Sequence, residues 1–141
     1  MQVGLWNDST SFPNLCSMKI SAYLKSTGDE TELYDETHSY DLIFASKVFT
    51  ESIEPDFGKT PVIRGGSGYG LHNKLPHYIE HIYPDYSLYP DFKAALGVLT
   101  RGCPRLNHAQ SRGGFCITPD KDGCRTRKVA DLPEFWKGQK E

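Results

Sequence analysis

The amino-acid sequence predicts an α/β fold built on an open, mostly parallel, Rossmann-like sheet. Three observations lead to this prediction. Short apolar runs typical of buried strands alternate with stretches of helical periodicity. A glycine-rich turn at 65–70 follows one apolar run, and a cysteine-containing loop follows another. The chain has 141 residues, which is enough for one domain with a substantial core.

The first predicted strand, 3–6, opens the chain and leads into a polar loop. Pro13 suits the first turn of a helix, because its φ is already fixed near the helical value. Apolar side chains then recur at Leu15, Met18 and Ala22, so we predict a helix that continues to residue 25. Gly28 ends this helix, at the position where glycine is favoured after a helix C-terminus.

The rest of the predicted sheet follows in chain order. Further strands are expected at 31–34, 42–48, 61–64 and 94–99, with a polar loop at 50–60, a short helix at 75–82 and an irregular aromatic segment at 83–92. Ligands of open parallel sheets bind beyond the carboxyl ends of the strands. We therefore expect both the glycine turn and the cysteine loop to lie along that edge.

The glycine turn is a candidate cofactor-binding site. Gly65, Gly66 and Gly68 would offer backbone N–H groups to an anionic ligand, since glycine allows a close approach. The turn has neither the dinucleotide-binding pattern Gly-x-Gly-x-x-Gly nor the Lys-Ser/Thr pair of a phosphate-binding loop. A tight turn without a ligand is the alternative interpretation.

Charge is distributed unevenly along the chain. The net charge is −2, yet residues 101–141 contain nine basic and five acidic residues. This excess of basic residues indicates either an anionic small-molecule ligand near the cysteine loop or ordinary surface charge. Nucleic-acid binding is not predicted. The sequence shows no apolar run that could span a bilayer and no signal peptide, so we expect a cytoplasmic protein with reduced thiols.

Three of the four cysteines lie between residues 99 and 124. Thiolates gathered in one loop can hold a metal ion or an iron–sulfur cluster. Cys103, His108, Cys116 and Cys124 would also supply four ligands of the types that zinc prefers, although only Cys103 and His108 have the close spacing of structural zinc sites. These four residues are the candidate metal ligands.

The frame Thr-Arg-Gly-Cys-Pro-Arg at 100–105, followed by Phe-Cys-Ile at 115–117, resembles the cluster loop of radical S-adenosylmethionine (SAM) proteins. In that family three cysteines are arranged as Cys-x3-Cys-x2-Cys. Cys103 matches the first and Cys116 the last. The middle cysteine is missing, and twelve residues separate the two cysteines instead of six. We expect Cys103 and Cys116 to lie within reach of each other despite this longer interval.

The resemblance extends over nearly the whole chain. The stretches 12–15, 18–23, 28–29, 32–35 and 65–69 are similar to the Rossmann-like, cobalamin-binding-like domain that precedes many radical SAM barrels, and 84–89 is similar to its link into the barrel. The stretches 129–132 and 134–140 resemble the segment that follows the cluster loop. The resemblance implies a Rossmann-like domain at 1–93 and the beginning of a radical SAM (β/α) barrel at 94–141. The chain then stops where the next barrel strand is expected, as a fragment would.

The resemblance also implies a chemistry. Family members bind a [4Fe–4S] cluster through three thiolates, and the open iron binds SAM, which is cleaved to a 5′-deoxyadenosyl radical. Cobalamin is not predicted, because the Asp-x-His-x-x-Gly motif is missing. Without the middle cysteine and most of the barrel, the isolated chain is not expected to be catalytic.

Two other function classes stay open. The chain could be a non-catalytic α/β module that binds a small molecule, or a small interaction protein stabilised by zinc. The sequence leaves the substrate and the oligomeric state undetermined.

Overall fold

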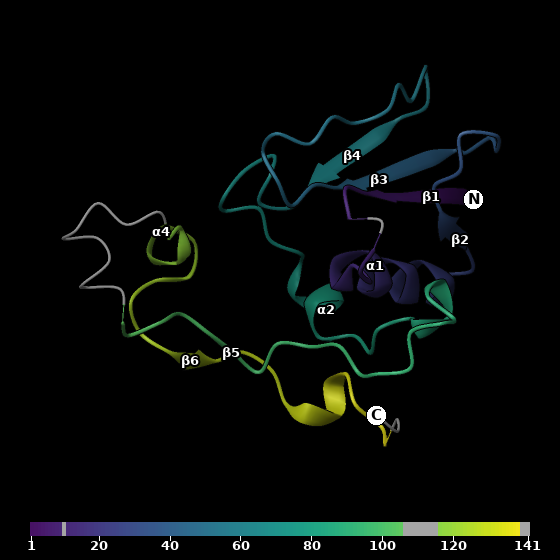
Figure 1. The fold of residues 1–141 in the computed structure, drawn as a ribbon. Coiled ribbons are helices and arrows are strands. Elements are labelled where there is room, and N and C mark those ends of the chain that lie inside the picture. The colour runs from purple at the N-terminus through teal and green to yellow at the C-terminus, as the bar shows by residue number, and fades with distance from the viewer. Residues whose placement is uncertain (10, 106–115, 139–141) are drawn as a thin grey trace.

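The computed structural model describes residues 1–9, 11–105 and 116–138. Its centre is a parallel four-stranded sheet with the order β2-β1-β3-β4 (Figure 1), formed by β1 (Gln2–Asn7), β2 (Glu30–Leu33), β3 (Leu42–Ser46) and β4 (Val62–Gly65). The prediction of an α/β fold with an open parallel sheet is confirmed. The strands expected at 3–6, 31–34, 42–48 and 61–64 are present, each within a few residues of its predicted ends.

One face of the sheet is covered by α1 (Leu15–Ser26), as Figure 1 shows. The Asn14 side chain caps this helix by accepting the N–H of Ser17 at 2.9 Å. Gly28 follows the helix at φ +92°, the left-handed conformation that the sequence predicts there. The buried core on this face combines strand and helix residues: Val3, Leu5, Ile20, Leu24 and Ile79.

The opposite face is covered by aromatic side chains from loops instead of a helix. Ile43 and Ala45 of β3 are buried there with Phe57, and Tyr34, Tyr40 and Tyr69 pack around them. The Tyr40 ring lies so close to Gly4 that a Cβ at this position would meet it at 3.1 Å. Strand alternation sends Val3 and Leu5 to the α1 face and leaves Gly4 beneath Tyr40.

Residues 76–92 run along α1 as short helical turns. α2 (His77–Glu80) is shorter than the predicted helix at 75–82, and η1 (Tyr86–Leu88) lies within the predicted aromatic segment. Asp85 fixes the segment to α1 by accepting Ser21 Oγ at 2.6 Å and Lys25 Nζ at 2.7 Å. Lys19 of α1 reaches the backbone carbonyl of Glu80 in the same way.

The prediction of a strand at 94–99 is wrong. Residues 94–99 make no strand ladder, and the Tyr86 hydroxyl takes the place of a neighbouring strand by accepting the N–H of Leu96 at 3.0 Å. Gly97 and two alanines also give this run little intrinsic strand preference. The next strand is β5 (Thr100–Arg101), which pairs antiparallel with β6 (Arg127–Lys128).

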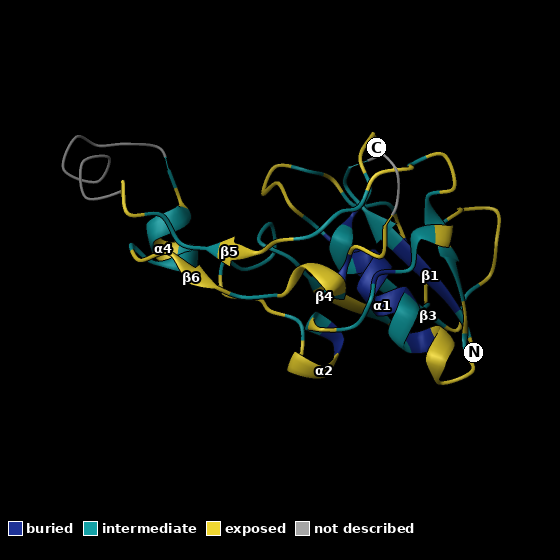
Figure 2. Cartoon of the chain, turned by 90° about the horizontal axis from the view of Figure 1, so that it is seen from below, coloured by how far each residue is buried: buried dark blue, intermediate teal, exposed yellow. Residues whose placement is uncertain are grey.

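The cysteine loop therefore does not extend the carboxyl edge of the parallel sheet, and that expectation is wrong. Figures 1 and 2 both show β5, β6 and α4 (Thr118–Asp122) beside the parallel sheet and not within it. Figure 2 also shows that the buried residues are concentrated in β1, β3 and α1, whereas β5 and β6 are mostly exposed. The start of a barrel at 94–141 stays a prediction.

The chain finally returns to the first part of the fold. η2 (Leu132–Glu134) places Glu134 Oε2 2.8 Å from His81 Nδ1, and the Tyr86 hydroxyl donates to the carbonyl of Phe135 at 2.6 Å. The Phe135 ring is buried against Gly97, where a Cβ would overlap it at 2.1 Å. In the described part of the chain, no helix is both long and apolar enough to cross a membrane.

Candidate functional site

The carboxyl edge of the parallel sheet is where a ligand of an open α/β fold is first sought. The strand order reverses between β1 and β3, so the crevice at their carboxyl ends is the topological switch point. Tyr89 fills this place. Its hydroxyl oxygen accepts Asn7 Nδ2 and the backbone N–H of Asn14, each at 3.2 Å.

The polar groups around Tyr89 are bound to one another. Asn14 Nδ2 donates to Ser46 Oγ at 3.2 Å, within a buried contact between the start of α1 and the end of β3. Cys16 lies nearby, and burial raises the pKa of its thiol, with a smaller opposing effect from the hydrogen bond with Ser46. A thiol with a raised pKa stays protonated, which disfavours Cys16 as a nucleophile or metal ligand.

Asp8 binds the backbone beside this site, at the carboxyl edge of the parallel sheet. Its carboxylate accepts the N–H of Val48 at 2.9 Å and of Phe49 at 2.8 Å, so it ties the end of β1 to the chain beyond β3. Burial raises the pKa of Asp8, but these backbone hydrogen bonds outweigh burial and the net pKa is lowered. The carboxylate is thus held charged and structural.

The glycine turn follows β4 at the carboxyl edge, as predicted. Gly66 adopts φ +94°, and a Cβ there would lie 2.3 Å from the carbonyl oxygen of Lys47. The N–H of Gly68 donates to that same carbonyl at 2.8 Å. Gly65 makes no such close contact, since a Cβ at this position would meet nothing within 4 Å. A Cβ at Gly68 would lie 2.9 Å from the carbonyl oxygen of Phe49 and 3.0 Å from that of Lys47, so two of the three candidate glycines are required by the packing of this turn.

Beyond the turn, Tyr69 joins an ion pair on the aromatic face. Glu54 accepts Arg64 NH2 at 2.7 Å and Arg64 Nε at 3.1 Å, and it also accepts the Tyr69 hydroxyl. Hydrogen bonding from Arg64, followed by that from Tyr69, lowers the pKa of Glu54. Burial, then this carboxylate, raises the pKa of Tyr69 to about 12. The phenol therefore stays protonated near neutral pH.

The candidate metal ligands belong to a small unit made of β5, β6 and α4. Cys103 comes two residues after β5, and its N–H donates to the carbonyl of Gly123 at 3.3 Å. This hydrogen bond places Cys103 beside the chain that enters Cys124. All the cysteines are free thiols and half-buried.

Cys116 lies just before α4, and its sulfur is 3.4 Å from Thr118 Oγ1. Hydrogen bonds from the Thr118 hydroxyl and then from its backbone lower the pKa of this thiol, which favours the thiolate. His108 lies outside the described residues. Over the ranges 1–9, 11–105 and 116–138, no three or more His, Cys, Asp or Glu side chains form a group that could hold a metal ion. The described cysteines alone do not supply the three-ligand set that the resemblance implies.

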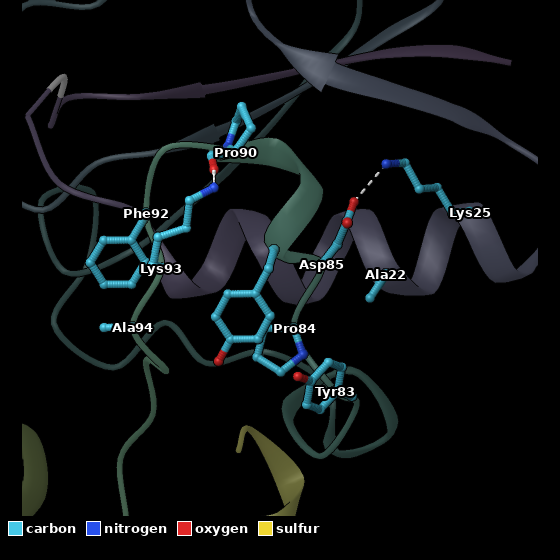
Figure 3. Close-up of a pocket in the computed structure, with 10 residues that line it drawn as sticks. Ala22, Lys25, Tyr83, Pro84, Asp85, Pro90, Phe92, Lys93 and Ala94 are labelled. Carbon is cyan, nitrogen blue, oxygen red and sulfur yellow. Dashed lines mark hydrogen bonds and ion pairs between the residues drawn. The ribbon is translucent and has the colours of Figure 1, made fainter. Parts of the chain in front are cut away.

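A pocket with a volume of about 650 Å³ lies elsewhere, between α1 and residues 83–94. Figure 3 shows Phe92 and Ala94 on one side of this pocket, and Ala22 and Tyr83 on the other. Pro84 and Pro90 complete a mostly apolar lining: Ala22, Lys25, Tyr83, Pro84, Asp85, Tyr86, Pro90, Phe92, Lys93, Ala94.

The charged groups around this pocket are predominantly cationic. Lys25 is paired with Asp85 at 2.7 Å, and Lys93 donates to the carbonyl of Pro90, as the dashed lines in Figure 3 show. Lys137 lies over the Tyr83 ring at 4.0 Å from its centroid. Two lysines and one aspartate thus line a pocket whose other walls are mostly aromatic and apolar.

Sequence reasoning missed both Tyr89 and this pocket. The aromatic segment 83–92 was predicted as irregular, and its composition does indicate side chains that need partners. What the sequence does not encode locally is that the segment folds back along α1 and delivers Tyr89 to the switch point. In comparisons with protein-family models, curated proteins and solved structures, no match to this chain was found.

Proposed function

We propose that this chain is a small-molecule-binding α/β module related to radical SAM proteins, and that it does not cleave SAM by itself. The observation that carries the proposal is the aromatic, cationic pocket between α1 and residues 83–94. The usual ligand position of such a sheet, the switch point, is occupied by the chain's own Tyr89. The pocket on α1 is a concave site with an apolar lining and a few polar groups, which suits a small molecule.

The ligand class follows from the lining. Tyr83 and Phe92 offer aromatic surfaces that suit a flat ring, and the ammonium group of Lys93 suits a negative charge on it. Asp85 is already neutralised by Lys25, since the two side chains form an ion pair at 2.7 Å. An organic anion with one or two aromatic rings therefore matches the pocket.

Binding is tested by calorimetric titration with 2-naphthoate and with 2-naphthylmethylamine, which has the same ring and the opposite charge. We expect 2-naphthoate to bind more tightly. Lys93→Ala should weaken that binding about fivefold, the effect of one partly screened charge contact of about 1 kcal/mol. Lys59→Ala removes an exposed lysine that does not line the pocket, and it should leave the affinity unchanged.

Equal affinity for the two probes would contradict the proposal that the pocket prefers an anion. Binding of 2-naphthoate that Lys93→Ala and Lys59→Ala affect equally would place the ligand outside this pocket, and the proposed function would then be wrong.

The second part of the proposal concerns SAM. The family chemistry requires three thiolates on one cluster, and here 106–113 stands where the middle cysteine is expected. We expect the protein, reconstituted anaerobically with iron and sulfide and then reduced, to form no 5′-deoxyadenosine from SAM. A variant with both Cys103→Ser and Cys116→Ser sets the background. Product above that background would overturn this part and leave the pocket proposal standing.

A further inference from the structure

The small antiparallel unit brings two cysteines together that the family resemblance does not pair. β5 and β6 pair Thr100 with Lys128 and Arg101 with Arg127. Continuing the same register places Gly102 opposite Thr126, and the Thr126 hydroxyl indeed lies 3.5 Å from the carbonyl oxygen of Gly102. Cys103 then comes opposite the 123–125 stretch.

The backbones approach each other closely at this point. Gly102 has φ +83°, and a Cβ there would lie 2.1 Å from the carbonyl oxygen of Arg125. The N–H of Cys103 donates to the carbonyl of Gly123 at 3.3 Å. Because Cys124 is bonded directly to that carbonyl, bond lengths and angles keep the Cα atoms of Cys103 and Cys124 within about 7 Å of each other.

A disulfide can bridge two cysteines whose Cα atoms lie within about 7 Å of each other. Both cysteines are free and half-buried, so neither is locked in the core. We propose that Cys103 and Cys124 form a site of reversible disulfide formation, with a low-molecular-weight disulfide such as oxidised glutathione as the oxidant. The proposal does not depend on the ligand-binding function.

The exchange balances in two steps. The thiolate of one cysteine attacks a sulfur of oxidised glutathione, which forms a mixed disulfide and releases one glutathione thiolate. The thiolate of the other cysteine then attacks the protein sulfur of that mixed disulfide, closes the Cys103–Cys124 bond and releases the second glutathione. Two protein thiols are oxidised, and one glutathione disulfide is reduced to two thiols.

The bond has a consequence for the loop. Cys103 is the residue that matches the first cluster ligand of the radical SAM frame, and in the disulfide it no longer offers a thiolate. Oxidation would also join the two sides of the β5–β6 unit, whose ladder is only two residue pairs long. The disulfide would thus link β5 to β6 covalently, and the sulfur atoms of Cys103 and Cys124 would no longer be available as thiolate ligands.

Peptide mapping tests the pairing. The protein is equilibrated in a glutathione redox buffer, remaining thiols are alkylated, and the chain is cleaved with trypsin. Cleavage after Arg and Lys separates the three loop cysteines into the peptides 102–105, 113–121 and 122–125. We expect the linked species to join 102–105 to 122–125, and it should disappear on reduction.

Variants complete the experiment. Cys116→Ser should retain the linked pair, whereas Cys103→Ser and Cys124→Ser should each leave the surviving partner as a mixed disulfide with glutathione. A main product that joins 102–105 to 113–121 would overturn the proposal in favour of the Cys103–Cys116 pair. Full alkylation of Cys103 and Cys124 across the whole range of redox buffers would overturn it as well.

Discussion

Local packing determines which glycines of this chain could be replaced by a residue with a side chain. Gly4, Gly66 and Gly97 lie where a Cβ would meet another group at 3.1 Å or less, namely the Tyr40 ring, the Lys47 carbonyl and the Phe135 ring. Gly65, one position before Gly66, has open space around it. The glycine run thus combines a position that excludes side chains with one that tolerates them, although all are identical in sequence.

This contrast gives a prediction at the residue scale. Gly66→Ala should lower the free energy of unfolding by about 2 kcal/mol or more, because it imposes a strained φ and a clash with the Lys47 carbonyl. Gly65→Ala is the matched control and should change it by less than about 1 kcal/mol. Urea unfolding followed by circular dichroism measures both. Similar losses for the two variants would contradict the steric account.

At the scale of elements, the Tyr89 side chain connects the first strand, the first helix and the aromatic segment. One hydroxyl joins Asn7 at the end of β1 with Asn14 at the cap of α1, and Tyr89 itself directly follows η1. These contacts hold the aromatic segment over the switch point.

We therefore predict that Tyr89→Phe lowers the free energy of unfolding by about 1–3 kcal/mol, since it leaves two donors without their acceptor. Tyr78→Phe removes the hydroxyl of a tyrosine that is 62% exposed, and its effect should stay within about 0.5 kcal/mol. Thermal and urea unfolding of the two variants would decide the point. A neutral Tyr89→Phe would mean that the hydroxyl contributes nothing to docking of the segment.

Some secondary-structure elements could be predicted from the sequence, and others could not. The four parallel strands and α1 carry their own signals, such as the apolar run 3–6 and the Gly28 stop, and these predictions are confirmed. The apolar run 94–99 predicted a strand, but Gly97 and two alanines have little strand preference, and Tyr86 and Phe135 contact the run from elsewhere in the chain. β5 and β6 are two residues each, too short to leave a periodic pattern.

The candidate site divides in the same way. The position of the glycine turn after β4 follows from strand order, and it is as predicted. The cysteine loop was expected at the same edge, but this inference depended on the strand at 94–99, which does not form. The pocket on α1 depends on the path of 83–94 through space, and no local motif encodes such a path.

The whole molecule is held together by several carboxylates that bridge distant segments. Asp8 binds the chain beyond β3, Asp85 binds α1, and Glu54 binds Arg64 of β4. For Asp85, burial raises the pKa, but hydrogen bonds from Lys25, Ser21 and Ser87 outweigh it and the net pKa is lowered. All three carboxyl groups therefore have folded-state pKa values below their ordinary values of 3.8 for Asp and 4.5 for Glu.

A depressed pKa makes stability depend on pH in a defined direction. Below the ordinary values, the unfolded chain binds protons that the folded chain does not, so stability falls as pH drops. Below about pH 5, we predict that the urea midpoint falls as the pH drops through the ordinary values towards the lower folded-state values. Asp85→Asn should make that fall shallower. A midpoint that rises on acidification would contradict the assigned role of these groups.

The order of strands in the sheet has a consequence for how the chain folds as it is synthesised. β1 is made first and lies in the interior of the sheet, between β2 and β3, and its register with both strands is complete once residue 46 has emerged. Tyr89 emerges more than forty residues later, so these strands are available to pair before Tyr89 can fill the switch point. A contact made after the rate-limiting barrier affects mainly the unfolding rate. If the Tyr89 hydroxyl makes its contacts after that barrier, Tyr89→Phe will increase the unfolding rate and leave the folding rate unchanged.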